Sequence, residues 1–250
     1  MNDLNKKAKV YAEKIRREFE LGHLMPVPDI FKLLEEKDIY VFKRPFQNTQ
    51  ISALYRRQKN NCLIIINSAR TLGHQIFSAA HELYHYYFNR EMTARICKVD
   101  TPNSKDLDET MADLFASHFL MPDEGVIELA ESRKNKKNKL DVTDVLFIQH
   151  FFNVSYKAMI RKLSELGYIE DINLYLNIPV QKLSEKLGYD IKIYQPTNDY
   201  YCSKNYLNLV IDVYELGLLS EKRANEYLGD VGLSFDNIAV EPIEGECFYE

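Results

Sequence analysis

The spacing of hydrophobic residues in the first part of the chain is typical of helices up to residue 36 and of strands from residue 39. Residues 5–21 and 29–36 carry apolar side chains three and four positions apart, which predicts two helices, the second capped by Asp29. Short aliphatic and aromatic runs typical of β-strands then cover residues 39–42, 51–55 and 62–66. The last run is continuously apolar, as in a central strand. This region therefore predicts helices beside a small, mostly antiparallel sheet.

Helical spacing dominates the rest of the chain. The predicted helices cover residues 72–90, 107–120, 142–152 and 155–166, a segment containing Leu183 and Leu187, and residues 207–216 and 220–228. Asn153 separates two of them into a tight helical hairpin, whereas the polar and basic residues 131–139 indicate a solvated loop. We therefore predict an α+β fold, divided into a core at 1–130, a helix-turn-helix-like hairpin packed on it at 131–169 and a small helical C-terminal module at 170–250.

The composition is that of a soluble globular protein. Its residues are 46% hydrophobic and 28% charged, and the net charge of −5 disfavours direct binding to nucleic acid. The N-terminus has no secretory pattern, and no run approaches the roughly 18 apolar residues of a membrane span. The four cysteines are too widely spaced for a zinc ribbon or a redox pair, which favours reduced, buried thiols. We therefore expect a cytoplasmic protein without membrane contact.

The sequence His81-Glu82-Leu83-Tyr84-His85 is the strongest candidate for chemistry. The two histidines are four positions apart in a predicted helix, so both imidazoles lie on one face and can bind the same tetrahedral zinc ion. Glu82 follows the first histidine, where its carboxylate reaches a metal-bound water rather than the metal. The motif thus combines two metal ligands with a general base.

A catalytic zinc site needs a third protein ligand and one position left for water. Glu109 and Asp113 are four positions apart in the next predicted helix, so they share a face. We assign Glu109 as the third ligand and Asp113 as the acceptor that orients a ligating histidine through its other ring nitrogen. The rival candidates for the third ligand are Asp106, Asp108 and His118.

The expected reaction is hydrolysis of a peptide bond with zinc as the cofactor. Zinc lowers the pKa of its bound water towards about 7. Glu82 takes a proton from this water and passes it to the leaving amine. The zinc ion stabilises the negatively charged oxygen of the tetrahedral intermediate. The abundant tyrosines supply candidates for a further hydrogen-bond donor to this oxygen.

Two stretches around these residues resemble the ImmA/IrrE family of metallopeptidases. Residues 77–85 are similar to its apolar lead-in to His-Glu-x-x-His, and residues 109–122 to its Glu-x-x-Ala-Asn/Asp-x-Phe-Ala segment ending in Leu-Met-Pro. The resemblance extends over about residues 8–169. Tyr84 departs from the glycine that is common in the family before the second histidine, and Asp113 from the frequent asparagine.

The resemblance implies a zincin-like metallopeptidase core with zinc bound by His81, His85 and Glu109, a gluzincin-like ligand set, and with Glu82 catalytic. It also implies a protein of a phage or mobile element that cuts a helix-turn-helix repressor and so relieves repression. The alternative is a non-proteolytic regulator, or a DNA- or partner-binding protein of a mobile element or toxin–antitoxin system. In that case, Lys157, Arg161 and Lys162 would lie on a recognition helix.

Overall fold

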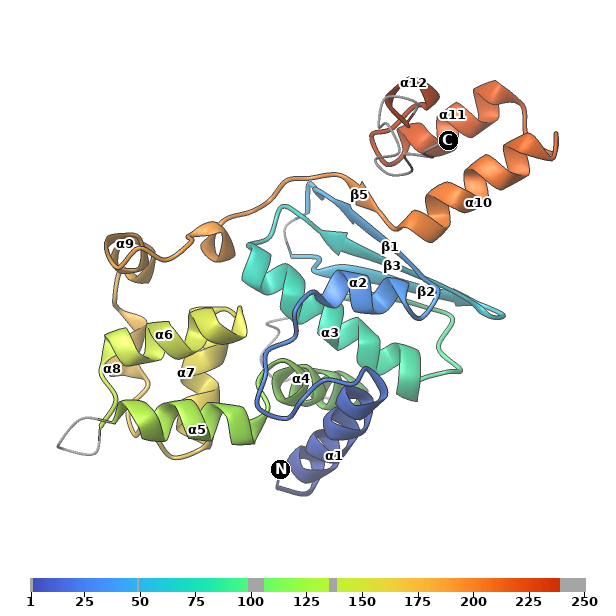
Figure 1. Ribbon diagram of the computed structural model, residues 1–250. Helices are drawn as coiled ribbons and strands as arrows, with labels where there is room; N and C mark the ends of the chain where they lie inside the picture. Colours follow the sequence, from blue (N-terminus) through green and yellow to red (C-terminus); the bar gives the residue numbers. More distant parts are fainter. Residues whose placement is uncertain (1, 49, 99–105, 135–138, 239–250) are drawn as a thin grey trace, which may run out of the picture.

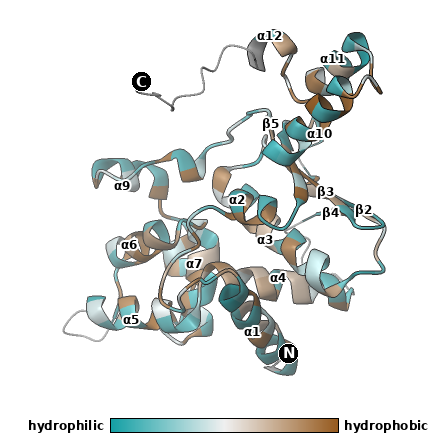
Figure 2. Ribbon diagram, turned by 45° about the vertical axis from the view of Figure 1, so that its right-hand side comes forward, coloured by the Kyte–Doolittle hydropathy of each residue, from teal (hydrophilic) through white to brown (hydrophobic). Residues whose placement is uncertain are grey.

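The computed structural model describes residues 2–48, 50–98, 106–134 and 139–238. It begins with helix α1 (Asn2–Glu18) and the short helix α2 (Ile30–Glu35), which Asp29 caps by accepting hydrogen bonds from the backbone N–H groups of Phe31 and Lys32. Helix α1 buries Ala8, Ala12 and Ile15, which follow one helical face. In Figure 2 this helix accordingly shows both teal and brown positions.

A single five-stranded sheet forms the centre of the fold, with strand order β4-β2-β3-β1-β5. Its strands are β1 (Ile39–Arg44), β2 (Ala53–Gln58), β3 (Asn61–Asn67), β4 (Ala94–Cys97) and β5 (Tyr201–Cys202). Only β1 and β3 are parallel among the pairings, so the sheet is mixed but mostly antiparallel. The α+β prediction is therefore confirmed, with β3 in the central position that its apolar run indicated.

Helix α3 (Leu72–Phe88) lies against one face of this sheet and contacts β2 and β3 (Figure 1). Helix α4 (Leu107–Leu120) packs on the other side of α3, and α1 packs on α4. Ala112 and Ala116 are fully buried, which allows α4 to approach its neighbours closely. Tyr84, the departure from a common glycine, packs its ring 5.7 Å from that of Phe115, so its bulk fills the interior between α3 and α4.

Helices α5 (Asp123–Arg133), α6 (Val142–Phe152) and α7 (Tyr156–Glu165) form the next layer. The predicted hairpin is present: Asn153 adopts a left-handed conformation with φ of 51°, and the Ser155 side chain caps α7. The predicted loop at 131–139 is wrong at its start, because α5 continues through Arg133. Residues 135–138 lie outside the described residues.

A buried ion-pair cluster joins α1, α4, α5 and α7. The Lys162 ammonium, with a side chain that is 0% exposed, lies 2.5 Å from the Asp123 carboxylate. The same carboxylate lies 2.9 Å from Lys9 Nζ and 3.1 Å from His118 Nδ1. His118 Nε2 is 2.7 Å from the side-chain oxygen of Asn5. Lys162 is therefore buried inside the protein, which counts against the alternative in which it lies on a DNA-facing recognition helix.

The rest of the chain crosses back over the molecule before it ends in a separate group of helices. It contains α8 (Asn173–Leu176), α9 (Val180–Lys186), the 3₁₀ helix η1 (Lys192–Tyr194) and then β5, which pairs with β1. Helices α10 (Lys204–Glu215), α11 (Glu221–Gly229) and α12 (Phe235–Ile238) follow, at the opposite end of the molecule from α5–α9 in Figures 1 and 2.

Helices α10 and α11 share a small core of their own, made of Val210, Ala224 and Leu228. By contrast, the segment before them is tied to the start of α3: the backbone N–H of Leu72 donates to the carbonyl of Gln195 at 2.9 Å. The expected division at 131 and 170 stays a prediction. Within the described ranges, no helix combines the length and apolarity needed to cross a membrane.

Gly125 allows α5 to meet the loop before α2 at very short range. A Cβ atom at this position would lie 2.5 Å from the carbonyl oxygen of Leu24. We therefore expect Gly125→Ala to lower the free energy of unfolding by about 1–3 kcal/mol, because the backbone must shift. Urea denaturation measures this change. Gly229→Ala is the matched control, since nothing lies within 4 Å of its added Cβ; an equal loss in both variants would contradict the steric explanation.

Candidate metal centre

Helix α3 positions the His-Glu-x-x-His residues in the interior. His81 is 1% exposed, and Glu82 and His85 are 0% exposed. The helix face that carries them is covered by the sheet on one side and by α4 on the other. Burial of three ionisable side chains in one helix turn is costly unless each finds a partner or a metal, so this group is a strong candidate for a functional site.

Each histidine is held through its Nδ1 atom. His81 Nδ1 lies 2.8 Å from Asp113 Oδ1, and His85 Nδ1 lies 3.0 Å from Asn89 Oδ1. Because each Nδ1 faces a side-chain oxygen, each ring can donate its Nδ1–H there, which leaves Nε2 as the atom available to a metal ion. The two Nε2 atoms face each other at 3.2 Å. The two Nε2 atoms thus point to one place, as two ligands of a single metal ion require.

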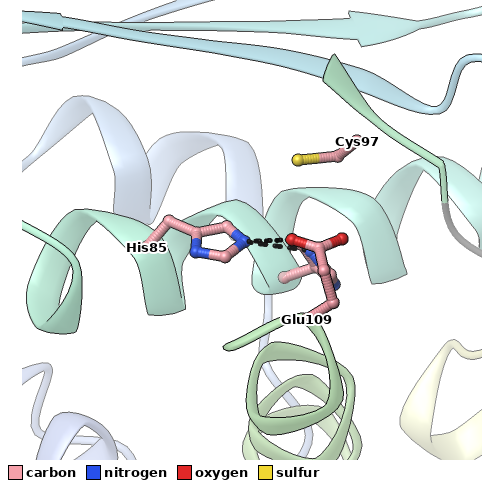
Figure 3. Close-up of side chains that lie close together, drawn as sticks. His85, Cys97 and Glu109 are labelled. Carbon is pink, nitrogen blue, oxygen red and sulfur yellow. Dashed lines mark hydrogen bonds and ion pairs between the residues drawn. The ribbon is translucent and has the colours of Figure 1, made fainter. Parts of the chain in front are cut away.

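Helix α4 brings Glu109 to the same point (Figure 3). Its carboxylate oxygens lie 3.2 Å from His85 Nε2 and 3.6 Å from His81 Nε2. Burial opposes ionisation, but the two histidines hold the pKa of Glu109 well below its usual range. Arg95 Nε, from β4, lies 2.9 Å from Glu109 Oε1 and fixes the carboxylate from the other side. The Glu109 carboxylate thus has a defined place beside both imidazoles.

The carboxylate of Glu82 is left without a hydrogen-bond partner. Among the described residues, neither of its oxygens accepts a hydrogen bond, although both are buried. Burial raises the pKa of Glu82 above its ordinary value, despite the opposing effect of His81 and His85. An orphaned buried carboxylate beside two imidazoles fits a site that receives a metal ion and a water molecule. A raised pKa also suits a group that takes up and returns a proton near neutral pH.

Cys97, at the end of β4, is the fourth side chain of the group. Ligand atoms of His81, His85, Cys97 and Glu109 all lie within 4.8 Å of one another. The thiol is fully buried, and burial followed by the Glu82 carboxylate raises the pKa of Cys97 to about 12. The expectation of a reduced, buried thiol agrees with its state, as it does for Cys62 and Cys202. Cys247 lies outside the described residues.

The rival candidates for the third ligand have other roles. Asp106 caps α4 and pairs with Arg95, and Asp108 is exposed. His118 belongs to the buried cluster around Asp123 and Lys162. Of the four residues considered for this role, Glu109 is therefore the one that the structure brings to the two histidines.

Three residues next to the site were not predicted from the sequence: Asn89, Arg95 and Cys97. Asn89 follows His85 by one helical turn, a spacing that gives a signal in the sequence, because i and i+4 share a face. Arg95 and Cys97 lie on β4, whose four residues carry no clear strand pattern. Their proximity depends on the pairing of β4 with β2, which places this short strand over α3.

Comparison with known families agrees with this geometry. A family model of peptidases, described as the IrrE N-terminal-like domain, matches residues 34–164, just over half of the chain. The matched segment runs from the end of α2 to α7 and includes every residue of the metal centre described above. A search of curated proteins gives no match.

Proposed function

Because the chain belongs to the metallopeptidase family of the IrrE N-terminal-like domain, we propose that it is a zinc-dependent endopeptidase with Glu82 as its general base. The observation that carries this proposal is the pairing of two opposed Nε2 atoms with an orphaned, fully buried carboxylate in the same helix turn. A structural zinc site needs no such base, so the arrangement favours catalysis over a purely structural metal.

The proposed ligands are His81, His85 and Glu109. Two imidazoles and one carboxylate are a ligand set that zinc prefers in hydrolytic enzymes, and the fixed Nδ1 atoms leave both Nε2 atoms available. When bound there, zinc supplies Lewis acidity for activating water and polarising a peptide carbonyl. Asp113 and Asn89 hold the imidazoles in the tautomer that binding requires.

Glu82 then accepts the proton of the attacking water and returns it to the leaving nitrogen. Its raised pKa brings the carboxyl group closer to the pH at which both transfers are efficient. Substrate is expected along β4, an edge strand of the sheet that carries Arg95 and Cys97 next to the site. An extended peptide adds to such an edge through backbone hydrogen bonds, which aligns its scissile bond with the site.

The proposed substrate is a helix-turn-helix transcriptional repressor, whose cleavage relieves repression. Support for this substrate is the resemblance of residues 77–85 and 109–122 to ImmA/IrrE metallopeptidases. The proposal places both proteins in the cytoplasm, which suits the three buried free cysteines. A DNA-binding role for α6 and α7 is less well supported, because Lys162 is buried and paired with Asp123.

The test is incubation of the zinc-loaded protein with the purified repressor encoded beside its gene. We expect one discrete cut, found by mass spectrometry of the fragments, and its loss when a chelator removes the metal. An unrelated helix-turn-helix protein serves as the substrate control and should stay whole. An intact repressor after incubation with protein that holds one equivalent of zinc would refute this substrate.

Removing the acceptors behind the histidines should weaken metal binding. We expect Asp113→Ala and Asn89→Ala each to lower zinc affinity by about 10–100-fold, because each frees an imidazole to rotate and change tautomer. Competition with a chromophoric chelator measures the affinity. Asp108→Ala, an exposed carboxylate on the same helix as Asp113, is the matched control and should bind zinc as the wild type does.

A further inference from the structure

The sulfur of Cys97 completes a set of four ligand atoms around one point. The set contains two imidazole nitrogens, one carboxylate oxygen and one sulfur, and these atoms lie within 4.8 Å of one another. They come from three consecutive elements of the chain: α3, β4 and α4. In Figure 3 the sulfur points from the strand into the space beside His85 and Glu109.

The number of protein ligands decides whether water can bind the metal. Zinc in proteins is usually tetrahedral, and a catalytic site keeps its fourth position for water, whereas a closed site fills it with a side chain. The proposed function uses three ligands, His81, His85 and Glu109. The sulfur of Cys97 is the remaining ligand atom of the same group, and thiolate is a preferred zinc ligand.

Glu82 is a second observation that points to this position. Its two oxygens are buried and lack partners, so the carboxylate faces space that a polar group is needed to fill. The Cys97 sulfur lies within 4.8 Å of the ligand atoms of His81, His85 and Glu109, and Glu82 directly follows His81 on the same helix. A sulfur bound as a fourth ligand would therefore occupy the place of the attacking water, beside the group proposed as base.

We propose that Cys97 binds the metal as a fourth protein ligand in the substrate-free enzyme and thereby keeps water from the position beside Glu82. This inference rests on the proposed function and adds regulation to the same site. The thiol would give up its proton to solvent when it binds the metal, because the ligand is the thiolate. Cleavage then requires an exchange of ligands in which the sulfur leaves the metal and takes up a proton again, while a water molecule takes its place. No carbon–sulfur bond is made or broken, and no oxidant is needed.

The position of β4 allows the Cys97 sulfur to move away from the metal. The strand has four residues and lies at the edge of the sheet, where it pairs with β2. Arg95 connects it to the start of α4 through Asp106 and Glu109. Among the described residues, β4 pairs with β2 alone, so a substrate can add to its other edge. Such a substrate acts on the element that carries the sulfur, so binding of the peptide and opening of the site are coupled.

X-ray absorption at the zinc edge tests the fourth ligand directly. The zinc-loaded full chain should show a sulfur neighbour at about 2.3 Å, distinct from nitrogen and oxygen neighbours at about 2.0–2.2 Å. Cys97→Ser should keep one zinc ion and lose the sulfur neighbour. Cys202→Ala, which removes a buried thiol from the opposite edge strand, should retain it. A wild-type spectrum with only nitrogen and oxygen neighbours would overturn the proposal.

Peptide cleavage tests whether the sulfur closes the site. We expect Cys97→Ala with one bound zinc ion to cleave the repressor several-fold faster than the wild type, because water no longer competes with a thiolate. Cys202→Ala should cleave at the wild-type rate. A rate for Cys97→Ala that equals or falls below the wild type, with zinc bound and the unfolding midpoint unchanged, would overturn the inhibitory role.

These results also separate this inference from the function on which it rests. Failure of the wild-type chain to bind zinc at His81 and His85 would refute both. Zinc bound without sulfur, in a protein that still cleaves its substrate, would refute the role of Cys97 alone. A sulfur neighbour in a protein that cleaves nothing would support the fourth ligand and refute the peptidase proposal.

Discussion

Glu82→Gln is expected to lower the rate of peptide cleavage by about 10²–10⁴-fold while the protein keeps its metal. The amide has nearly the same shape as the carboxylate but accepts no proton from water. The three proposed ligands are untouched, so zinc content should stay at one equivalent. The loss corresponds to about 3–5 kcal/mol in the activation free energy. Initial rates on the repressor, at equal zinc occupancy, measure it.

The matched control for this variant is Glu128→Gln, an isosteric change at an exposed position of α5. It should cleave at the wild-type rate. Unfolding by urea separates a chemical effect from a structural one, because a buried carboxylate without a partner does not stabilise the apo fold. Cleavage by Glu82→Gln at more than a tenth of the wild-type rate would exclude Glu82 as the general base.

Lys162→Met is expected to produce the largest loss of stability, about 3–5 kcal/mol. Lys162 is fully buried and lies 2.5 Å from Asp123, so its removal takes away the nearest positive charge from a carboxylate that is 13% exposed. Lys9 and His118 still contact Asp123, but they do not replace the buried ammonium. Urea denaturation of the apo protein measures the change without a contribution from metal binding.

Lys157→Met provides the control, since Lys157 is exposed on the same helix. Its effect should stay within about 0.5 kcal/mol. The double variant Lys162→Met with Asp123→Asn should lose less stability than the two single changes added together, because the unpaired charge is removed with its partner. Additive losses would show that the two residues act independently and would contradict the ion-pair explanation.

The same cluster sets a limit on stability in acid. Burial opposes ionisation, but His118 and Lys162 hold the pKa of Asp123 well below its ordinary value. The folded pKa is thus lower than the unfolded value of about 3.9. The stabilisation is complete above that unfolded value and is lost as the pH falls towards the folded pKa. Asp123→Asn should therefore lose less stability than the wild type between about pH 4 and pH 2.

Most of the helices and three strands could be predicted because their apolar positions repeat over several turns or run continuously through the sheet. The remaining elements lack such a pattern. Strand β4 has four residues and β5 has two, and their positions depend on pairing with distant strands. Helix α5 directly follows Pro122 and contains Gly125, features that resemble a turn in sequence. It is stabilised by tertiary contacts that a local pattern does not contain.

The residues of the candidate site likewise fall into those that the sequence predicts and those that it does not. The grouping of His81, Glu82 and His85 follows from helical spacing, and Glu109 with Asp113 follows from the same rule on the next helix. Their metal-binding and catalytic roles remain proposals. Cys97 was expected only as a reduced thiol, because nothing in its own neighbourhood reveals that β4 lies above α3. Sheet topology, rather than any motif, brings the sulfur to the histidines.

The pairing of β5 with β1 has a consequence for synthesis on the ribosome. The Val41 backbone N–H donates to Ser203 Oγ, a partner 162 residues later in the chain. At 5–20 residues per second, the later partner follows the earlier one by about 8–30 s. The helices of the metal centre are synthesised within that interval, up to Leu120, while one edge of β1 is unpaired and open to pairing with other nascent chains. The last quarter of the chain therefore acts on its own first strand as an intramolecular cover, and C-terminal truncation should favour aggregation even though the metal ligands are retained.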